Sequence, residues 1–281
     1  MPAYVGLDCA IQTGPTAAAF DKIEGGEIGY DQSLAHLTGA GGQDSTVYSM
    51  IEPKGNADTW LQSLSMIACV TKAAANALPT VIPQIDGGVL GVDMKKQTSC
   101  YINSCKLSCE IGGAVKASYE WVALGMTASA VSTAAAAKAK NLMLLWHSST
   151  VLYGGGTFAC QTWESTLENG LKLSTSQDGK TAGVQRMPES VAPGNQKVSL
   201  TAEFKAPPTF DLLKDIPATL AFVFTAKNTE TSAKTFTHTV GSSLHPVTQP
   251  TKIASGENEV TWSIAAECDY DDLSAWLVTL A

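Results

Sequence analysis

Residues that could bind a metal ion or act as a nucleophile are present, but the sequence does not group them. The chain contains seven cysteines and no Cys-x-x-Cys pair. Its four histidines lie far apart: His36, His147, His238 and His245. A zinc site needs closely spaced ligands, and a cysteine nucleophile needs a histidine with an orienting partner. The sequence therefore predicts no metal site, no cofactor site and no catalytic trio.

The cysteines are better explained as core residues. Cys105 and Cys109 fall on one face of a predicted strand, and Cys100 is close to them in sequence. Thiols on the inward face of an amphipathic strand commonly serve as small apolar residues. An odd number of cysteines without regular spacing indicates reduced thiols in a cytosolic product.

Other motifs of enzymes and binding sites are absent or incomplete. Gly154–Gly156 follows a predicted strand, but no Gly-Lys-Ser/Thr comes after it, so we predict a turn and not a phosphate loop. Asp269, Asp271 and Asp272 lack the spacing of a calcium loop and are predicted to cap a helix over 273–280. Paired carboxylates of a glycosidase could still be remote in sequence. The chain shows no concentration of aromatic and acidic residues, and we predict that it is not an enzyme.

Composition narrows the function classes further. The chain has 281 residues, a net charge of −8, 44% hydrophobic residues and 16% charged residues. This length and apolar content allow a full-sized core, and the absence of a basic cluster argues against a nucleic-acid binder. The first twenty residues do not form a signal peptide. The longest apolar run, around Leu142–Trp146, is far shorter than the roughly 20 residues of a membrane span, so no membrane anchor is expected.

The stretch Thr98–Gly125 is organised as a β-hairpin around Gly112 and Gly113. Its residues alternate with period two, and glycines supply the backbone conformations of a tight turn. One face is predicted to hold Tyr101, Asn103, Cys105, Leu107, Cys109, Ile111, Val115, Ala117, Tyr119, Trp121 and Ala123. A three-residue loop pairs Ile111 with Val115. On the opposite face this register pairs Glu110 with Lys116, Ser108 with Ser118 and Lys106 with Glu120, so that opposite charges face each other twice.

The remaining pattern is also mainly that of strands. We predict strands over Tyr4–Gln12, Leu142–Thr150, Thr157–Leu171, Val198–Phe204, Leu220–Ala226, Thr235–Val240 and Glu259–Cys268. Apolar residues three and four apart over 58–78, ended by Pro79, predict an amphipathic helix. Met126–Asn141 is compatible with either a helix or an exposed excursion.

The predicted fold class is mainly β: an antiparallel β-sandwich or barrel with a flanking α-helix and long loops. We divide the chain into an N-terminal strand with a Gly-rich arm or insertion, 1–57, and a β-sandwich domain, 58–281. The domain contains the helix 58–78 and a long loop, 172–197. Ordinary loops are much shorter than this one, so we expect it to be functional or covered by a partner.

Four pieces of sequence occur in an order that resembles a known family. They are the strand and Gly-Gly hairpin Cys100–Leu124; a strand ending in Leu167–Leu171; Met187–Ser190 with Pro193 and Gly194 before the strand Val198–Phe204; and a short Asp-containing helix before Leu220–Phe224. Together they resemble the tail tube proteins of long-tailed bacteriophages, over roughly 58–269. Residues 1–55 and 127–140 fit this resemblance less well.

The resemblance implies a structural protein of the virion, made in the host cytoplasm. In that family a β-sandwich or barrel assembles into rings, usually hexameric, which stack into a hollow tube through which the genome leaves. It further implies contacts with copies of itself and with the tape measure and tail-end proteins. DNA would pass along the lumen without specific binding.

Six polar residues of the hairpin are our candidates for lining such a lumen: Lys106, Ser108, Glu110, Lys116, Ser118 and Glu120. If their charges pair, the surface would not hold phosphate. Two alternatives remain open at this point. One is a related tube, such as a secretion-system ring or the inner tube of a contractile phage. The other is an extracellular β-sandwich adhesin or carbohydrate-active protein.

Overall fold

Antiparallel strands dominate the computed structural model. It describes residues 9–13, 21–38, 44–132, 139–154, 156–157, 159–174, 187–205, 220–229, 233–248, 251–252 and 261–281. Strands account for 67% of the structure and helices for 3%, which confirms the prediction of a mainly β, sandwich-like fold. The expected short helix near 209–215 and the start of the expected strand Tyr4–Gln12 lie outside the described residues.

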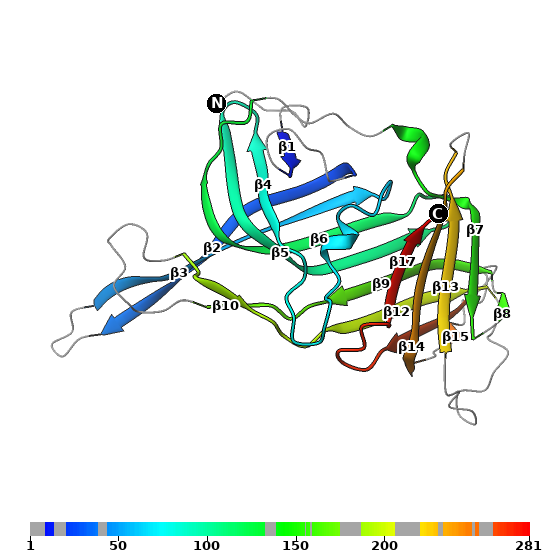
Figure 1. Cartoon of the computed structure of the whole chain (residues 1–281). Helices are drawn as coiled ribbons and strands as arrows, with labels where there is room; N and C mark the ends of the chain where they lie inside the picture. Colours follow the sequence, from blue (N-terminus) through cyan, green and yellow to red (C-terminus); the bar gives the residue numbers. More distant parts are fainter. Residues whose placement is uncertain are drawn as a thin grey trace.

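The strands form two layers (Figure 1). The large sheet has the order β2 (Lys22–Thr38), β3 (Asp44–Trp60), β6 (Lys116–Ala128), β5 (Asp93–Glu110), β9 (Cys160–Glu168), β12 (Lys197–Phe204) and β16 (Thr261–Glu267). The small sheet has the order β17 (Trp276–Leu280), β14 (Thr235–Thr248), β13 (Leu220–Lys227), β7 (Leu145–Tyr153) and β8 (Gly156–Thr157). β14 belongs to both layers, because its first half pairs with β13 and β17 and its second half with β16.

Short elements complete the fold. They are β1 (Cys9–Gln12), β4 (Ile82–Val89), β10 (Lys172–Ser174), β11 (Ser190–Ala192), β15 (Thr251–Lys252) and the 3-10 helices η2 (Ile67–Cys69) and η3 (Lys140–Leu142). β10 and β11 pair with each other within the long 172–197 connection.

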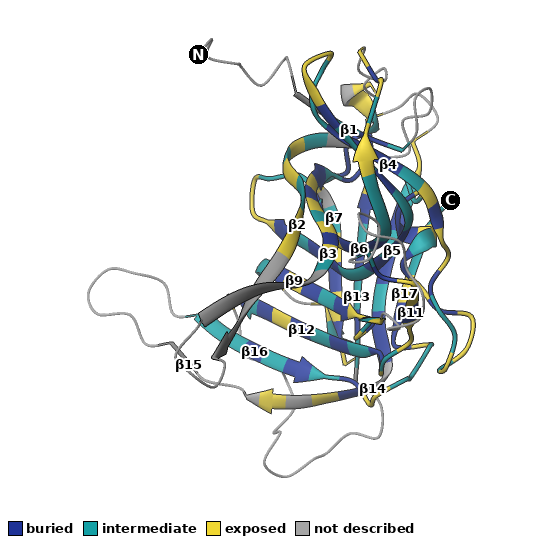
Figure 2. Ribbon diagram, turned by 90° about the vertical axis from the view of Figure 1, so that its left-hand side faces the viewer, coloured by how far each residue is buried: buried dark blue, intermediate teal, exposed yellow. Residues whose placement is uncertain are grey.

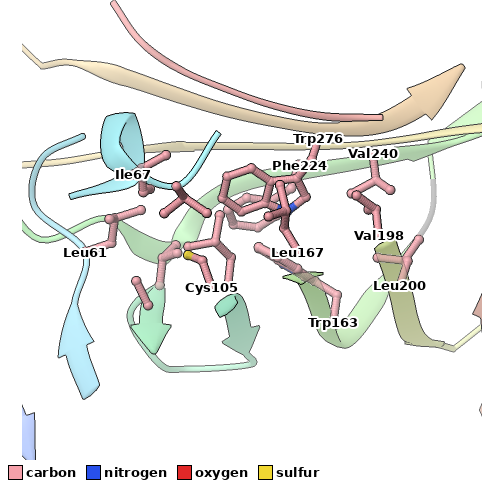
Figure 3. Packing of buried hydrophobic residues seen from close by; sticks show 14 of the residues in the cluster. Leu61, Ile67, Cys105, Trp163, Leu167, Val198, Leu200, Phe224, Val240 and Trp276 are labelled. Carbon is pink, nitrogen blue, oxygen red and sulfur yellow. The ribbon is translucent and has the colours of Figure 1, made fainter. Parts of the chain in front are cut away.

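The sandwich core lies between the two sheets and is rich in aromatic residues (Figure 3). The Trp163 ring from the large sheet lies 4.7 Å from the ring of Phe224 and 5.7 Å from that of Phe222 in the small sheet. In the predicted strand Val198–Phe204, every second residue is buried and the others face outward, as expected. Figure 2 shows this alternation of buried and more exposed residues along β9, β12 and β16. The sandwich therefore follows from period-two patterning on both sheets.

A second packed region, the N-terminal lobe, is formed where β1 and β4 fold back over β2 and β3. Here side chains pack directly on glycine backbones. An added Cβ on Gly26 or on Gly87 would lie within 2.7 Å of the side chain of Ile11 or Ile28, respectively. Gln97 is fully buried and donates from Nε2 to the carbonyl oxygens of Gly29 and Lys54. Its Oε1 accepts a hydrogen bond of 2.7 Å from Trp121 Nε1.

The register of the central hairpin differs from the prediction by two residues. Ser108 pairs with Lys116 and Leu107 with Ala117, instead of Ser118 and Tyr119. The reason lies outside the hairpin. The Ile111 amide donates to the carbonyl of Gln161 in β9, and the Val115 amide donates to the carbonyl of Leu144. These neighbours use the backbone groups near the turn that the predicted Ile111–Val115 pairing requires, and the turn is consequently longer.

A β-bulge at Asn103 is a second correction. Cys105, Leu107 and Cys109 are buried as predicted, but before the bulge the buried residues are Cys100 and Ile102, and not Tyr101 and Asn103. The bulge is held from outside the hairpin. Asn103 Oδ1 accepts from the Leu171 amide at 2.7 Å, and its carbonyl accepts from the amide of Asn169 at 2.7 Å.

The predicted flanking helix over 58–78 does not form. Residues 58–60 complete β3 and pair with β6, and only Ile67–Cys69 make a single 3-10 turn. Asp21 explains part of the difference, because its carboxylate accepts hydrogen bonds from the Gln62 and Ser63 amides and fixes a non-helical path. The apolar spacing instead reflects a loop that packs Leu61, Met66, Ile67 and Val70 against the sandwich core.

The prediction of a helix over 273–280 is also wrong. Trp276–Leu280 is strand β17, which pairs with Phe236–Val240 of β14. Asp272 caps the preceding turn instead, since its Oδ1 accepts from the Ser274 amide and hydroxyl. Trp276 is buried and Leu277 is exposed, which is the alternation of a strand on the edge of a sheet.

The division of the chain at 57/58 falls within β3, which pairs with β6 continuously from Lys54 to Trp60. Beyond this paired part, β2 and β3 continue as a hairpin that extends away from the sandwich (Figure 1).

Candidate functional site

A continuous polar surface covers the side of the large sheet that faces away from the small sheet. We call it the polar face and define it on β6, β5, β9, β12 and β16. Its residues are Lys116, Ser118 and Glu120; Ser104, Lys106, Ser108 and Glu110; Thr162, Glu164, Thr166 and Glu168; Lys197, Ser199, Thr201 and Glu203; and Ser263, Ala265 and Glu267. The residues between them along each strand are buried, so the sequence alternation creates this face directly.

All six residues predicted to line a lumen lie on the polar face, but their predicted partners are wrong. Lys106 Nζ lies 3.3 Å from a carboxylate oxygen of Glu164 on β9. Lys116 Nζ lies 2.8 Å from a carboxylate oxygen of Glu24 on β2. Both partners come from outside the hairpin, because the corrected register places Ser118 and Ser108 opposite these lysines. Sequence reasoning within one hairpin could not find Glu24 or Glu164.

The charges of the polar face are arranged so that its three lysines are all neutralised. In addition to the pairs of Lys106 and Lys116, Lys197 Nζ lies 2.9 Å from Glu267. Hydrogen bonds to Glu24 and to Glu267 raise the pKa of Lys116 and of Lys197, respectively, so both stay charged and paired at neutral pH. The face also carries six glutamates: Glu110, Glu120, Glu164, Glu168, Glu203 and Glu267. Its net charge is therefore negative.

An open hollow of about 540 Å³ lies on this face. Its lining is mainly hydroxyl and carboxylate side chains with one lysine: Ser108, Glu110, Lys116, Thr162, Glu164, Thr201, Glu203 and Ser263. Trp163 also lines it, but this residue is only 2% exposed and its ring packs against Phe222 and Phe224. The hollow thus lacks an exposed aromatic platform of the kind on which sugars stack, and it is a shallow polar depression.

A serine–histidine contact exists, but it is enclosed in the sandwich core. His238 Nε2 lies 3.0 Å from Ser165 Oγ, which accepts a hydrogen bond of 2.8 Å from Trp276 Nε1. His238 Nδ1 donates to the carbonyl of Leu277 at 3.1 Å, so Nε2 accepts from the serine hydroxyl. Both Ser165 and His238 are 0% exposed, and burial lowers the pKa of the imidazole to about 4. No substrate reaches this pair, and its role is to satisfy buried polar atoms.

The cysteines of the described residues are also core groups. Six are free thiols, and all of them except the half-buried Cys69 are buried. Burial raises the pKa of Cys109 and of Cys160 to about 12, so neither is a thiolate at neutral pH. Within the same described ranges, no group of three or more His, Cys, Asp or Glu side chains is placed to hold a metal ion.

The family model described as "Phage tail tube protein" matches residues 59–275, which is more than three quarters of the chain. This chain belongs to the phage tail tube protein family. The resemblance inferred from the sequence is therefore confirmed. A comparison with curated proteins found no match.

Membership in the tail tube family gives the protein a structural role in the phage tail, as part of the virion. It also implies assembly with copies of itself and with other tail components. The family suggests a non-enzymatic role. Among the residues that the structure describes, no helix is long and apolar enough to cross a membrane.

Proposed function

We propose that this tail tube protein forms rings, usually hexameric in the family, that stack into a hollow tube with the polar face lining the lumen. Phage DNA would pass along this surface into the host. The observation that supports the lumen assignment is the charge arrangement of the polar face. It has six glutamates, and each of its three lysines is paired with a carboxylate.

This arrangement suits passage more than binding. Proteins hold DNA mainly by neutralising phosphates with lysine and arginine side chains. On the polar face the ammonium groups already have carboxylate partners, and the excess glutamates repel a polyanion. We therefore expect the surface to let DNA slide without specific contacts.

The order of the strands supports ring closure through sheet edges. The second half of β14 continues the large sheet beyond β16, which gives the order β2-β3-β6-β5-β9-β12-β16-β14. These are eight strands, and each neighbouring pair is antiparallel. β2 and β14 consequently run in opposite directions. Copies related by rotation about a tube axis could then join β14 of one subunit to β2 of the next as an ordinary antiparallel pair. Only the second half of β14 is available for this pairing, because its first half already pairs with β13 and with β17. There the pairing would also satisfy exposed backbone groups of the two edges.

Two segments are our candidates for further contacts between subunits or rings. They are the Lys172–Lys197 connection, which contains the isolated β10–β11 pair, and the Thr13–Gly55 arm, which contains most of the projecting β2–β3 hairpin. Tape measure and tail-end proteins are the other partners that we propose. If the segments make contacts, their amide hydrogen exchange should slow when tubes form. Exchange as fast in tubes as in free subunits would exclude them.

The lumen assignment can be tested by charge reversal. Glu120→Lys, and then Glu110→Lys with it, should slow genome release from assembled virions without preventing tube formation. Asp93→Lys is a matched control, because it makes the same charge change outside the polar face. Release kinetics would be measured together with tube length by electron microscopy. Normal release by the double variant would show that the polar face does not line the channel.

A further inference from the structure

The strand β17 (Trp276–Leu280) is an edge of the small sheet that no strand in the described part of the chain covers. It pairs with β14 on one side only, and Figure 1 shows it at the margin of that sheet. Its sequence, Trp-Leu-Val-Thr-Leu, contains no charged residue, proline or glycine. Such residues usually protect edge strands, because an open edge invites pairing with another chain. β17 lacks this protection.

The strand β2, at the far edge of the large sheet, shows the protected arrangement. An irregularity of register lies between Ile23 and Gly25. Four charged residues stand in the first ten positions of the strand: Lys22, Glu24, Glu27 and Asp31. A strand that approaches this edge meets charge, whereas a strand that approaches β17 does not.

Backbone hydrogen bonds show which groups β17 uses within its own sheet. Thr235 and Ala281 exchange two N–H···O bonds, of 2.7 and 2.9 Å. Pairs that exchange both bonds alternate along an antiparallel ladder with pairs that exchange none. Leu277 and Thr279, which pair with Thr239 and Thr237, therefore also direct their N–H and C=O groups toward β14.

The residues between them are the ones that face the open edge. Trp276, Val278 and Leu280 direct their backbone N–H and C=O groups away from β14, and none of these groups bonds to a described residue. Their side chains point into the sandwich, where Trp276 is buried but Val278 and Leu280 are only partly buried. Both the backbone and the core are thus incompletely covered along β17.

The strand is complementary to a second copy of itself. Antiparallel pairing centred on Val278 sets Val278 against Val278 of the other copy, and Trp276 against Leu280. These positions then form the hydrogen-bonded pairs, so every free backbone group of both edges gains a partner. The inward apolar side chains meet and cover each other. On the outer face Leu277 lies opposite Thr279, and no charge opposes the contact.

We propose that β17 is a docking edge for a second copy of this chain, which pairs with it about a two-fold axis at Val278. The inference goes beyond the ring and tube, because the ring contact proposed above uses β2 and the second half of β14. A two-fold pair is closed, since neither copy keeps a free β17, and association stops at two copies. The contact thus covers an uncharged edge in free subunits and prevents unlimited edge-to-edge aggregation.

The concentration dependence of the purified full chain tests the proposal first. One five-residue strand per copy buries much less than the roughly 800 Å² per partner of a standard interface, so the pair should be weak. We expect a dissociation constant on the order of 100 µM in sedimentation equilibrium, under conditions where rings are absent. A wild-type chain that stays monomeric up to about 1 mM would overturn the proposal.

Two substitutions weaken the pair in different ways. Val278→Pro removes the N–H at the centre of the contact, and edge strands tolerate proline where the N–H faces away from the sheet. Leu277→Lys, at a position that is 51% exposed, brings two ammonium groups near each other across the axis. Each should raise the dissociation constant about tenfold or more, with thermal melts to verify folding.

Leu152→Lys is the matched control. Leu152 lies in the same outward row of the small sheet as Leu277, but on β7, away from the open edge. It is 38% exposed, so the lysine reaches solvent in this variant as well. The control should pair with the wild-type dissociation constant.

Crosslinking tests the register. Leu277→Cys and Thr279→Cys variants, mixed and treated with oxidised glutathione, should give disulfide-linked pairs, because these positions face each other with Cα atoms about 4.5 Å apart. Either variant alone should give far fewer, since its two cysteines would lie diagonally, roughly 7–8 Å apart.

Two results would contradict the docking edge even if the wild type pairs. They are undiminished pairing of both Val278→Pro and Leu277→Lys, and equal crosslinking by mixed and unmixed cysteine variants. Either would show that another surface or another register holds the copies together. Failure of the wild type to form rings would instead contradict the proposed function, because the two-fold pair does not depend on rings.

Discussion

The sandwich core and the N-terminal lobe are packed by different means. In the core, large rings fill the space between two sheets, with Trp163, Phe222 and Phe224 in direct contact. In the lobe, strands come close because glycines leave room, as at Gly26, Gly55 and Gly87, and a buried amide, Gln97, joins the layers. The comparison shows that a sheet can be covered either by large side chains that fill the space between two layers or by side chains that pack directly on glycine backbones.

The largest effect is expected from emptying the core. Trp163→Ala should reduce the free energy of unfolding by about 3–5 kcal/mol, because the rings around it cannot close the cavity completely. Ile11→Ala in the lobe should cost clearly less, since Ile11 is only partly buried. Chemical denaturation of both variants measures the difference. Equal losses would mean that the two regions depend on side-chain volume to the same degree.

Adding a side chain in the lobe should lower the free energy of unfolding nearly as much as removing one from the core. A Cβ at position 55 would lie 2.4 Å from Trp121 Cζ2 and 2.7 Å from the Glu27 carbonyl oxygen, so Gly55→Ala should cost about 3 kcal/mol. Gly25→Ala is the matched control on the facing strand, because nothing lies within 4 Å of its added Cβ. Thermal denaturation should leave this control near wild type. A tolerated Gly55→Ala would show that the packing of Trp121 directly on the Gly55 backbone is not needed for stability.

Acid should weaken the core through His238. Burial lowers the folded-state pKa of His238 to about 4, whereas the unfolded imidazole titrates near 6.5. The contribution of the neutral imidazole is therefore complete above pH 6.5 and is lost as the pH falls toward 4, by about 3 kcal/mol in total. Unfolding free energies between pH 7 and 4 should fall more steeply for the wild type than for His238→Gln.

The buried polar anchors should matter equally in both regions. Gln97→Met leaves the Trp121 indole N–H and the Gly29 and Lys54 carbonyls without this amide, and should cost about 1–3 kcal/mol. Ser165→Ala removes the hydroxyl that contacts His238 and Trp276 in the core and should cost a similar amount. Denaturant titrations of the two variants give the comparison. A neutral Gln97→Met would show that the lobe does not need its amide.

The smallest effect is expected outside both interiors. Lys116→Met removes the ion pair with Glu24, but both side chains are more than 40% exposed, so the loss should be within about 1 kcal/mol. Glu24→Gln should give a comparable small change. A larger loss in either would indicate that this pair holds β2 against the sheet.

The two regions also differ in how well the sequence predicts them. Core strands with strict alternation, such as Val198–Phe204 and Leu220–Ala226, form where expected, because period two directly encodes burial on one face. The alternation of apolar and polar residues does not predict the packing of the N-terminal lobe. Its glycines resemble turn residues in the sequence, yet Gly26 and Gly55 lie inside strands. Their role depends on which side chains pack on them, Ile11 on Gly26 and Trp121 on Gly55.

The sequence predicted which residues share the polar face, but it did not predict which ion pairs they form. The alternation of Lys106–Glu110 and Lys116–Glu120 placed all six residues on one face. Their ion pairs involve Glu164 and Glu24, and the hairpin register is set by β9 and by Leu144, so both depend on tertiary contacts. The helix expected over 58–78 failed for the same kind of reason, since Asp21 and β6 compete for its backbone.

The bulge at Asn103 has a consequence for the whole of β5. One additional residue changes the phase of the strand, so that Cys100 and Ile102 before the bulge and Cys105 and Leu107 after it all face the same hydrophobic core. A deletion at this position would leave the strand long enough for both halves. It would force them into a single phase, and one half of β5 would then turn its polar side to the core.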